Sequence, residues 1–382
     1  MTRQDLKTIK RLVLKIGSSV IASSSQGLNE ARMHGIAQEV FALRHRGVEV
    51  IIVSSGAVIC GMEKMGLKKR PQAISIKQAA AAVGQGELIR AYERVFCPFK
   101  IKVAQILLTQ EDLNDRKRFL NSRNTLMTLL DHQILPIINE NDTVAVEEIR
   151  FGDNDHLSGS VSHLIDAHLL AILSDVDGLF TSDPRGMPDA RLISEVAEVD
   201  DRVEALAGGS RTIEGTGGML SKVRTARKVT AYGVPVLVLN GSDPRNLARA
   251  IEGESVGTLF IPRPTRLPSR KHWIVHTLKA EGRLILDPGA VEAVAGKGRS
   301  LLPSGILRVE GRFKAGDSVA CLSIEGKEIA RGLSNYSSGE VNRIVGARSA
   351  EIEIRLGYKI ADEVIHRDNL VVFGLQPGEG PG

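Results

Sequence analysis

The chain is short of aromatic residues, cysteines and long apolar runs, and each shortage excludes a class of protein. Aromatic residues are 4% of its 382 residues, which argues against a platform that stacks single-stranded nucleic acid bases. Its three cysteines, Cys60, Cys97 and Cys321, lie far apart, so we expect free thiols in a reducing cytoplasm. No apolar run approaches the ~18 residues of a membrane span. Lys15 interrupts the apolar stretch near the N-terminus, so we expect no signal peptide.

The chain also lacks a large excess of charge of either sign. The formal net charge is +5, and residues 273–373 hold 14 basic and 13 acidic residues. Because phosphate contacts dominate nucleic-acid affinity, this balance disfavours RNA binding by that segment without excluding it. The remaining composition, 42% apolar and 25% charged, is that of a folded protein with a sizeable core.

Six short apolar runs recur along the first two thirds of the chain, with helical patterns between them. Near-continuous hydrophobicity is typical of strands buried on both faces, and the alternation with helices predicts an α/β fold, a mainly parallel sheet sandwiched by helices. Ligands of such sheets bind at the carboxyl ends of the strands. The predicted strands are residues 11–16, 48–53, 101–108, 134–138, 169–173 and 234–239, and the predicted helices are residues 29–46, 76–96, 118–130 and 156–167.

The pattern changes near residue 260, where a stretch rich in proline and basic residues begins. We expect a catalytic domain over residues 1–261 and a linker over residues 262–272. Short strand-like pieces with glycine turns predict a small β-barrel domain over residues 273–373. Residues 374–382, rich in glycine and proline, are expected to be a flexible tail.

A glycine-rich loop is the most informative motif. Residues 215–222 read GTGGMLSK and precede a helical pattern. Glycines allow φ > 0 and a close approach of backbone N–H groups to a ligand, and the N-terminus of a helix suits phosphate. Lys222 adds a positive charge there, although the chain has no Walker P-loop. Lys15 lies in the apolar strand VLKIGSS (residues 13–19), where burial without a partner would be costly. Two lysines beside glycine-containing turns predict a phosphoryl-transfer site.

Aspartate and asparagine are dense in two segments, INENDTV (residues 138–144) and FGDNDHLS (residues 151–158). Asp142, Asp153 and Asp155 could orient cationic groups or Mg²⁺, and the asparagine between the last two could bind a polar substrate. The alternative, ordinary turn formers and helix caps, stays open. The segments SSGA and SDVDGLF, each after a predicted strand, allow the same two interpretations.

Taken in order, VLKIGSS, VSSGA, INEND, GDND, SDVDGLFTSDPR and GTGGMLSK closely resemble the motifs of the amino acid kinase family. The resemblance runs from about Lys10 to Phe260, and the barrel beyond it resembles a PUA domain. INEND with GDND, followed by the glycine-rich loop and a PUA-like tail, is similar to the members that phosphorylate glutamate rather than aspartate, acetylglutamate, carbamate or uridylate. The implied architecture is an amino acid kinase fold followed by a PUA-like β-barrel.

The resemblance also implies an activity. Such members use ATP, with Mg²⁺, to phosphorylate the γ-carboxylate of L-glutamate, giving L-glutamyl 5-phosphate and ADP in the first step of proline biosynthesis. It further implies a cytoplasmic homo-oligomer, inhibition by proline, and transfer of the product to glutamyl phosphate reductase.

Site residues follow from the same resemblance, position by position. Lys15 and Lys222 contact the transferring phosphoryl group, and Asp155 organises them. Ser55, Asp142 and Asn154 hold glutamate. No residue is assigned to a bound metal. The ATP contacts are Lys15, Ser174, Asp175, Thr216, Gly217, Gly218, Met219, Leu220, Ser221 and Lys222.

The chemistry of the residues agrees with this activity. The γ-carboxylate of glutamate, with a pKa of about 4.3, is already a nucleophile at neutral pH, so no general base is needed. Two anions must be aligned and their charge neutralised, which lysines, Mg²⁺ and backbone N–H groups can do. Two alternatives stay open, an RNA-binding protein and a kinase of the same fold that acts on another small acid or on a nucleotide.

Overall fold

The computed structural model describes residues 1–23, 27–69, 71–144, 154–184, 186–208, 218–262 and 280–373. The chain divides into two compact units, Met1–Thr265 and Arg266–Gly382. The predicted linker, apart from residue 262, and the predicted tail lie outside the described residues.

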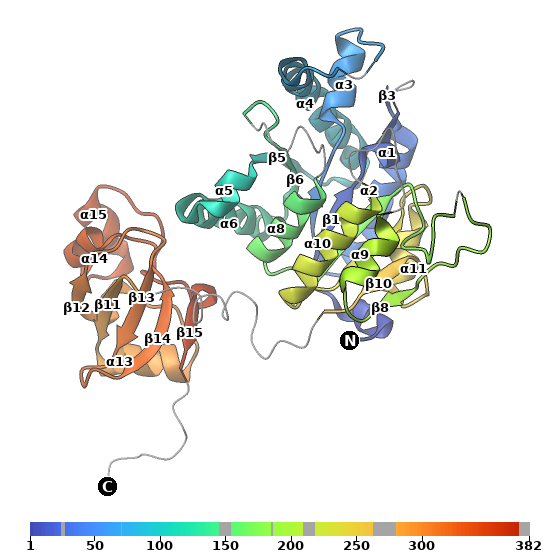
Figure 1. Ribbon diagram of the computed structural model, residues 1–382. Coiled ribbons are helices and arrows are strands. Elements are labelled where there is room, and N and C mark those ends of the chain that lie inside the picture. The colour runs from blue at the N-terminus through green and yellow to red at the C-terminus, as the bar shows by residue number, and fades with distance from the viewer. Residues whose placement is uncertain are drawn as a thin grey trace. The chain divides into compact units, whose positions relative to one another are not determined.

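The first unit is built on an eight-stranded sheet with the strand order β5-β6-β4-β1-β7-β9-β10-β8 (Figure 1). Neighbouring strands are parallel except for β10, which runs antiparallel to β9. This confirms the predicted mainly parallel sheet. The strands are β1 (Arg11–Ile16), β4 (Glu49–Val53), β5 (Val103–Leu108), β6 (Leu135–Glu140), β7 (Leu169–Ser174), β8 (Glu195–Val196), β9 (Val236–Asn240) and β10 (Thr258–Phe260), with a small separate pair, β2 (Ala22–Ser23) and β3 (Gly27–Leu28).

Helices cover both faces of this sheet and form two hydrophobic cores. Successive strand residues point to opposite faces, so Leu12 and Leu14 enter the core under α2, α4 and α11, whereas Val13 enters the core under α6, α8 and α10. The helices of this unit are α1 (Ser18–Ile21), α2 (Glu30–His45), α3 (Ala57–Lys64), α4 (Ile74–Phe96), α5 (Gln110–Asn114), α6 (Arg116–Asp131), α8 (Asp155–Leu164), α9 (Asp201–Ala207), α10 (Met219–Ala231) and α11 (Arg245–Ile251).

Helices α3 and α4 pack backbone against backbone (Figure 1). A Cβ atom on Gly61 would lie 1.7 Å from the carbonyl oxygen of Ala80, and one on Gly84 would lie 1.9 Å from that of Ala57. Backbone atoms cannot move aside as the end of a flexible side chain can, so both positions require glycine. The contact fixes α4 against the first turn of α3, directly after the loop that ends β4.

We expect Gly84→Ala to destabilise the protein by about 1–3 kcal/mol, because the added methyl group forces the two helices apart. At about 2–4 °C per kcal/mol for a domain of this size, the melting temperature should fall measurably. Gly86→Ala is the matched control, since Gly86 lies in the same helix and a Cβ there meets nothing within 4 Å. That variant should be as stable as the parent or more so. Equal melting temperatures for the two variants would contradict the close helix contact.

The N-terminal segment is fastened to the far edge of the same sheet. Arg3, which is buried, lies in the short helix Arg3–Thr8. Its guanidinium donates to the carbonyl oxygens of Ser194 at 2.6 Å and of Val256 and Gly257 at 2.9 Å each. These carbonyls flank β8 and β10, so the first residues of the chain hold together the two strands at this edge of the sheet.

The second unit contains a five-stranded sheet with the order β12-β11-β13-β14-β15. Neighbours are antiparallel except for β11 and β13, which are parallel. Apolar residues of the strands and of α14 and α15 fill one core, which includes Leu284, Cys321 and Tyr336. The elements are β11 (Gly282–Leu286), α13 (Pro288–Val291), β12 (Ile306–Gly311), β13 (Ser318–Leu322), β14 (Glu328–Leu333), α14 (Ser338–Ile344), α15 (Ile352–Leu356) and β15 (Leu370–Val372).

Candidate active site

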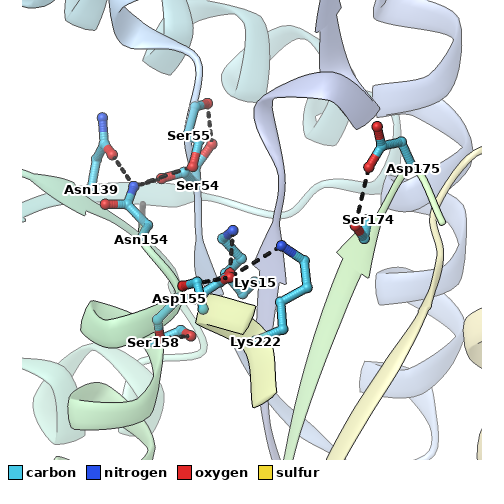
Figure 2. Close-up of polar contacts among 11 residues, drawn as sticks. Lys15, Ser54, Ser55, Asn139, Asn154, Asp155, Ser158, Ser174, Asp175 and Lys222 are labelled. Carbon is cyan, nitrogen blue, oxygen red and sulfur yellow. Dashed lines mark hydrogen bonds and ion pairs between the residues drawn. The ribbon is translucent and has the colours of Figure 1, made fainter. Parts of the chain in front are cut away.

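A buried group of three charges lies at the carboxyl edge of the first sheet. Asp155 forms ion pairs with both predicted lysines, through Oδ1 with Lys15 and through Oδ2 with Lys222 at 3.1 Å (Figure 2). Ser221 Oγ donates to the same Oδ2 at 3.3 Å. Asp155 is fully buried, and each lysine is 4% exposed. The structure therefore brings together the three residues predicted to be catalytic.

The sequence pattern explains why these groups meet. Lys15 is next but one to Val13 in β1, so its side chain points to the face that α8 and α10 cover. Asp155 is the first residue of α8, where the helix dipole favours a negative charge, and Lys222 is in the first turn of α10. One strand and two helix N-termini thus converge.

The electrostatics of this group favour an anionic ligand. Burial opposes the ionisation of Asp155, but the charges of Lys15 and Lys222 outweigh it and hold the pKa of this carboxyl well below its usual range. Two ammonium groups and one carboxylate leave one net positive charge. A positive charge of this kind attracts an anion, so the arrangement is complementary to a phosphate group or a carboxylate.

A cluster of amides and hydroxyls lies beside the charged group (Figure 2). The side-chain NH₂ of Asn154 donates to the backbone carbonyl of Ser54, to Asn139 Oδ1 at 2.7 Å and to Ser55 Oγ at 3.3 Å. Ser54 and Ser55 follow β4, and Asn139 is near the end of β6. Gly56, with φ of 107°, is the N-cap residue that precedes α3. Ser55 and Asn154, both predicted to bind the substrate, are therefore in contact, and SSGA is also the tight turn of the alternative interpretation.

Two further residues of this cluster come from α4 and were not among the predicted site residues. Gln85 Oε1 accepts a hydrogen bond from Asn139 Nδ2 at 2.7 Å, and the hydroxyl of Tyr92 lies 2.7 Å from Ser54 Oγ. Tyr92 is one of only four tyrosines in the chain, and this rarity was the one signal that the sequence offered. In the structure its side chain is fully buried. Gln85 lies between two glycines in an alanine-rich helix, and nothing in that pattern indicates a site.

On the other side of the charged group, the edge of the sheet offers polar atoms for a nucleotide. Ser174 ends β7, and its hydroxyl donates to Asp175 Oδ1 at 3.2 Å (Figure 2). On the neighbouring strand, Asn240 Nδ2 donates to Asp177 Oδ1 at 2.8 Å. The charged group therefore has one polar cluster on each side, as a transfer between two ligands requires.

The other predicted residues have mixed outcomes. Gly218 precedes α10 with φ of −65°, so the positive φ expected of the loop is not used there. Asp142 lies in the turn two residues after β6, half-buried. Met219 and Leu220 begin α10. Thr216, Gly217 and Asp153 lie outside the described residues.

Over the part of the chain that the structure describes, no three His, Cys, Asp or Glu side chains gather to hold a metal ion. Both carboxylate oxygens of Asp155 contact lysines. Mg²⁺ is commonly bound by one or two carboxylates together with substrate phosphates. The residues present, Asp175 among them, fit a cation that arrives with a nucleotide. Within the same described ranges, no helix combines the length and apolar character needed to cross a bilayer.

Comparison with known proteins agrees with the fold. The chain matches the amino acid kinase family over residues 10–240 and the PUA domain over residues 282–356. The chain belongs to the amino acid kinase family, and its second unit carries a PUA domain.

Along nearly its whole length the chain is similar to glutamate 5-kinases. The glutamate 5-kinase of Geobacter sulfurreducens is 54% identical over 96% of this chain and 99% of that protein. The one from Geobacter metallireducens has the same identity and coverage. The enzyme of Herpetosiphon aurantiacus is 48% identical over 95% of this chain and 98% of its own.

Proposed function

We propose that this protein is a kinase that transfers the γ-phosphoryl group of ATP to the γ-carboxylate of L-glutamate, giving L-glutamyl 5-phosphate and ADP in the first step of proline biosynthesis. The observation that carries the proposal is the buried group of Lys15, Asp155 and Lys222, with its net positive charge and a polar cluster on each side. Relatives of about 50% identity that span nearly the whole chain are glutamate 5-kinases.

The reaction needs no general base. A γ-carboxylate oxygen of glutamate forms the new bond to phosphorus, while the bond between that phosphorus and the bridging oxygen of ADP breaks. Negative charge spreads over the phosphoryl oxygens during this transfer. Lys15 and Lys222 neutralise it, and Asp155 keeps both ammonium groups at fixed positions, so no reorganisation is needed when the charge develops.

Each side of the site takes one substrate. Ser55, Asp142 and Asn154 hold glutamate, and Ser174, Asp175 and the loop that leads into α10 hold ATP. Mg²⁺, bound by the nucleotide phosphates and a carboxylate such as Asp175, would supply further charge neutralisation. Residues 216–222 provide N–H groups and a helix N-terminus for the phosphates.

The proposal extends to partners that the family resemblance implies. The protein acts as a cytoplasmic homo-oligomer, is inhibited by proline, and passes its labile acyl phosphate to glutamyl phosphate reductase. RNA binding by the PUA domain is the less favoured alternative, because residues 273–373 are nearly neutral.

A substrate panel tests the activity. The purified protein is assayed for ADP release with glutamate, aspartate, acetylglutamate, carbamate and UMP, each with ATP and Mg²⁺. We expect turnover with glutamate and little with the others. Faster turnover with any other acceptor would overturn the proposal and identify a different kinase of this fold.

Asp142→Ala and Asn154→Ala should raise KM for glutamate about tenfold each, which is the loss of one hydrogen bond to a charged group, and leave KM for ATP nearly unchanged. Asp142 can accept from the α-ammonium of glutamate, and Asn154 touches Ser55 in the polar cluster. Initial-rate kinetics with each substrate varied separately provides the measurement. If KM for ATP rises instead, the two halves of the site are assigned the wrong way round.

A further inference from the structure

We propose that Gln85 and Tyr92, both on α4, are positioning residues that hold the side-chain carbonyl oxygen of Asn154 toward the α-ammonium of the substrate, and so select free amino acids. The inference rests on the proposed function and adds to it which group of the substrate is recognised and which side chains recognise it. Its starting point is the chain of hydrogen bonds from α4 through Asn139 and Ser54 to Asn154.

The orientation of the Asn154 amide is fixed by a backbone carbonyl. The carbonyl oxygen of Ser54 can only accept, so the group that faces it must be the NH₂ of Asn154. That NH₂ also reaches Asn139 Oδ1. The hydrogen bond between the two asparagines therefore has a fixed direction, with Asn154 as the donor and Asn139 as the acceptor.

Gln85 completes the order at the next amide. Since Asn139 accepts through Oδ1, its NH₂ faces Gln85, and Gln85 must present Oε1 as the acceptor, as it does at 2.7 Å. Without that acceptor, the Asn139 amide could turn over, and its NH₂ would then face the NH₂ of Asn154. Gln85 thus favours the one arrangement in which Asn154 donates to its neighbours.

Tyr92 holds the other end of the chain. Ser54 Oγ donates to the carbonyl oxygen of Ser55 at 3.1 Å, so its partner at 2.7 Å, the Tyr92 hydroxyl, is the donor. Burial raises the pKa of Tyr92, which keeps its proton in place. Gln85 and Tyr92 are seven residues apart, about two helical turns, and so lie on one face of α4. The Gly84 contact with Ala57 sets the distance of that face from the loop after β4.

The consequence is a defined polarity in the substrate cluster. The two N–H groups of Asn154 are directed to the Ser54 carbonyl and Asn139 Oδ1, with Ser55 Oγ at 3.3 Å sharing one of them. Asn154 therefore has Oδ1 left for a ligand, and among the described residues none donates a hydrogen bond to that oxygen. An oxygen acceptor pairs with an ammonium group and not with a carboxylate. The cluster therefore recognises a free α-ammonium and rejects substrates in which it is missing or acylated.

Two substitutions at Gln85 separate the acceptor from the shape of the side chain. Gln85→Met keeps the length and removes the acceptor, whereas Gln85→Glu keeps an acceptor and removes the donor. We expect Q85M to raise KM for glutamate about three- to tenfold, the effect of one weakened hydrogen bond, with KM for ATP and kcat nearly unchanged. Q85E should restore KM toward the parent value. Tyr92→Phe should behave as Q85M does.

Inhibition by two glutamate analogues shows which substrate group is affected. Glutarate lacks the α-ammonium, and γ-aminobutyrate keeps the amine and lacks the α-carboxylate. We expect Q85M to leave the inhibition constant of glutarate unchanged and to raise that of γ-aminobutyrate as much as it raises KM for glutamate. The opposite pattern, or an equal loss for both analogues, would overturn the proposal, because Asn154 would then read the carboxylate or α4 would only support the fold.

The outcome can be distinguished from a failure of the proposed function. If the parent protein shows no glutamate-dependent ADP release, the function itself is wrong. If the parent is active and Q85M matches it in KM, only the role of Gln85 is refuted. Melting temperatures of Q85M and Y92F, measured alongside, identify a variant that fails to fold. In that case Q85E provides the test, and we expect its inhibition constants for glutarate and γ-aminobutyrate to match those of the parent.

Discussion

Replacing Lys222 or Lys15 by alanine is expected to lower kcat for glutamate phosphorylation about 10²–10³-fold, the usual effect of losing one preorganised electrostatic contact. KM for glutamate should change far less, because the charge that these lysines neutralise develops during the transfer and not on binding. Both ammonium groups are buried on Asp155, at the centre of the site. Steady-state kinetics of the purified variants gives the comparison.

Lys228→Ala is the matched control for this experiment. Lys228 lies in the last turn of the same helix α10 and is exposed, so its loss should leave kcat unchanged. A folded K222A or K15A variant with parental kcat would remove the basis for phosphoryl transfer at this site. An effect on KM for ATP alone would move the lysines from catalysis to nucleotide binding.

The second large effect is expected from Asp155→Asn. Removing the carboxylate leaves two buried ammonium groups without their counter-charge, and breaking a buried ion pair in this way typically costs about 3–5 kcal/mol. The variant should therefore unfold at clearly lower denaturant concentration. Activity should fall as well, since the lysines lose the group that fixes their positions. Chemical denaturation followed by circular dichroism measures the loss of stability.

The pH dependence of that loss identifies its cause. The folded-state pKa of Asp155 is depressed, so its contribution to stability is present above the unfolded-state pKa of about 3.9 and disappears as the pH falls through the lower folded-state value. The difference in unfolding free energy between parent and D155N should be constant near neutral pH and shrink below about pH 4. A difference that stays the same in acid would mean that packing and not charge is lost.

Much of this fold could be predicted because its strands are buried on both faces. The run at residues 11–16 was predicted with the observed bounds of β1, and each of the other five apolar runs overlaps a strand of the sheet, with bounds that differ by one or two residues at an end. The antiparallel β10 was missed. A three-residue strand has no periodicity, and its direction depends on the strands beside it, which a local pattern does not specify.

The site could be predicted where a charged residue stands in an apolar segment, and not elsewhere. Lys15 in an apolar strand indicated a partner, and Asp155 is that partner. The support from α4 gave no such signal, because Gln85 is ordinary in a helix and Asn139 is ordinary at the end of a strand. Their meaning comes from the order of donors and acceptors across four elements, which only the three-dimensional arrangement defines.

The fastening of Arg3 to the edge of the sheet has a consequence for biosynthesis. Strand β8 has β10 as its neighbour in the sheet, and β10 and the carbonyls of Val256 and Gly257 are the last parts of the first unit to be made. During synthesis, Arg3 can form its hydrogen bonds to Val256 and Gly257 only after these residues, near the end of the domain, have been made. The kinase domain can therefore complete this edge only after residue 260 has been made, and a nascent chain that stops short of β10 exposes a sheet edge that could pair with another strand.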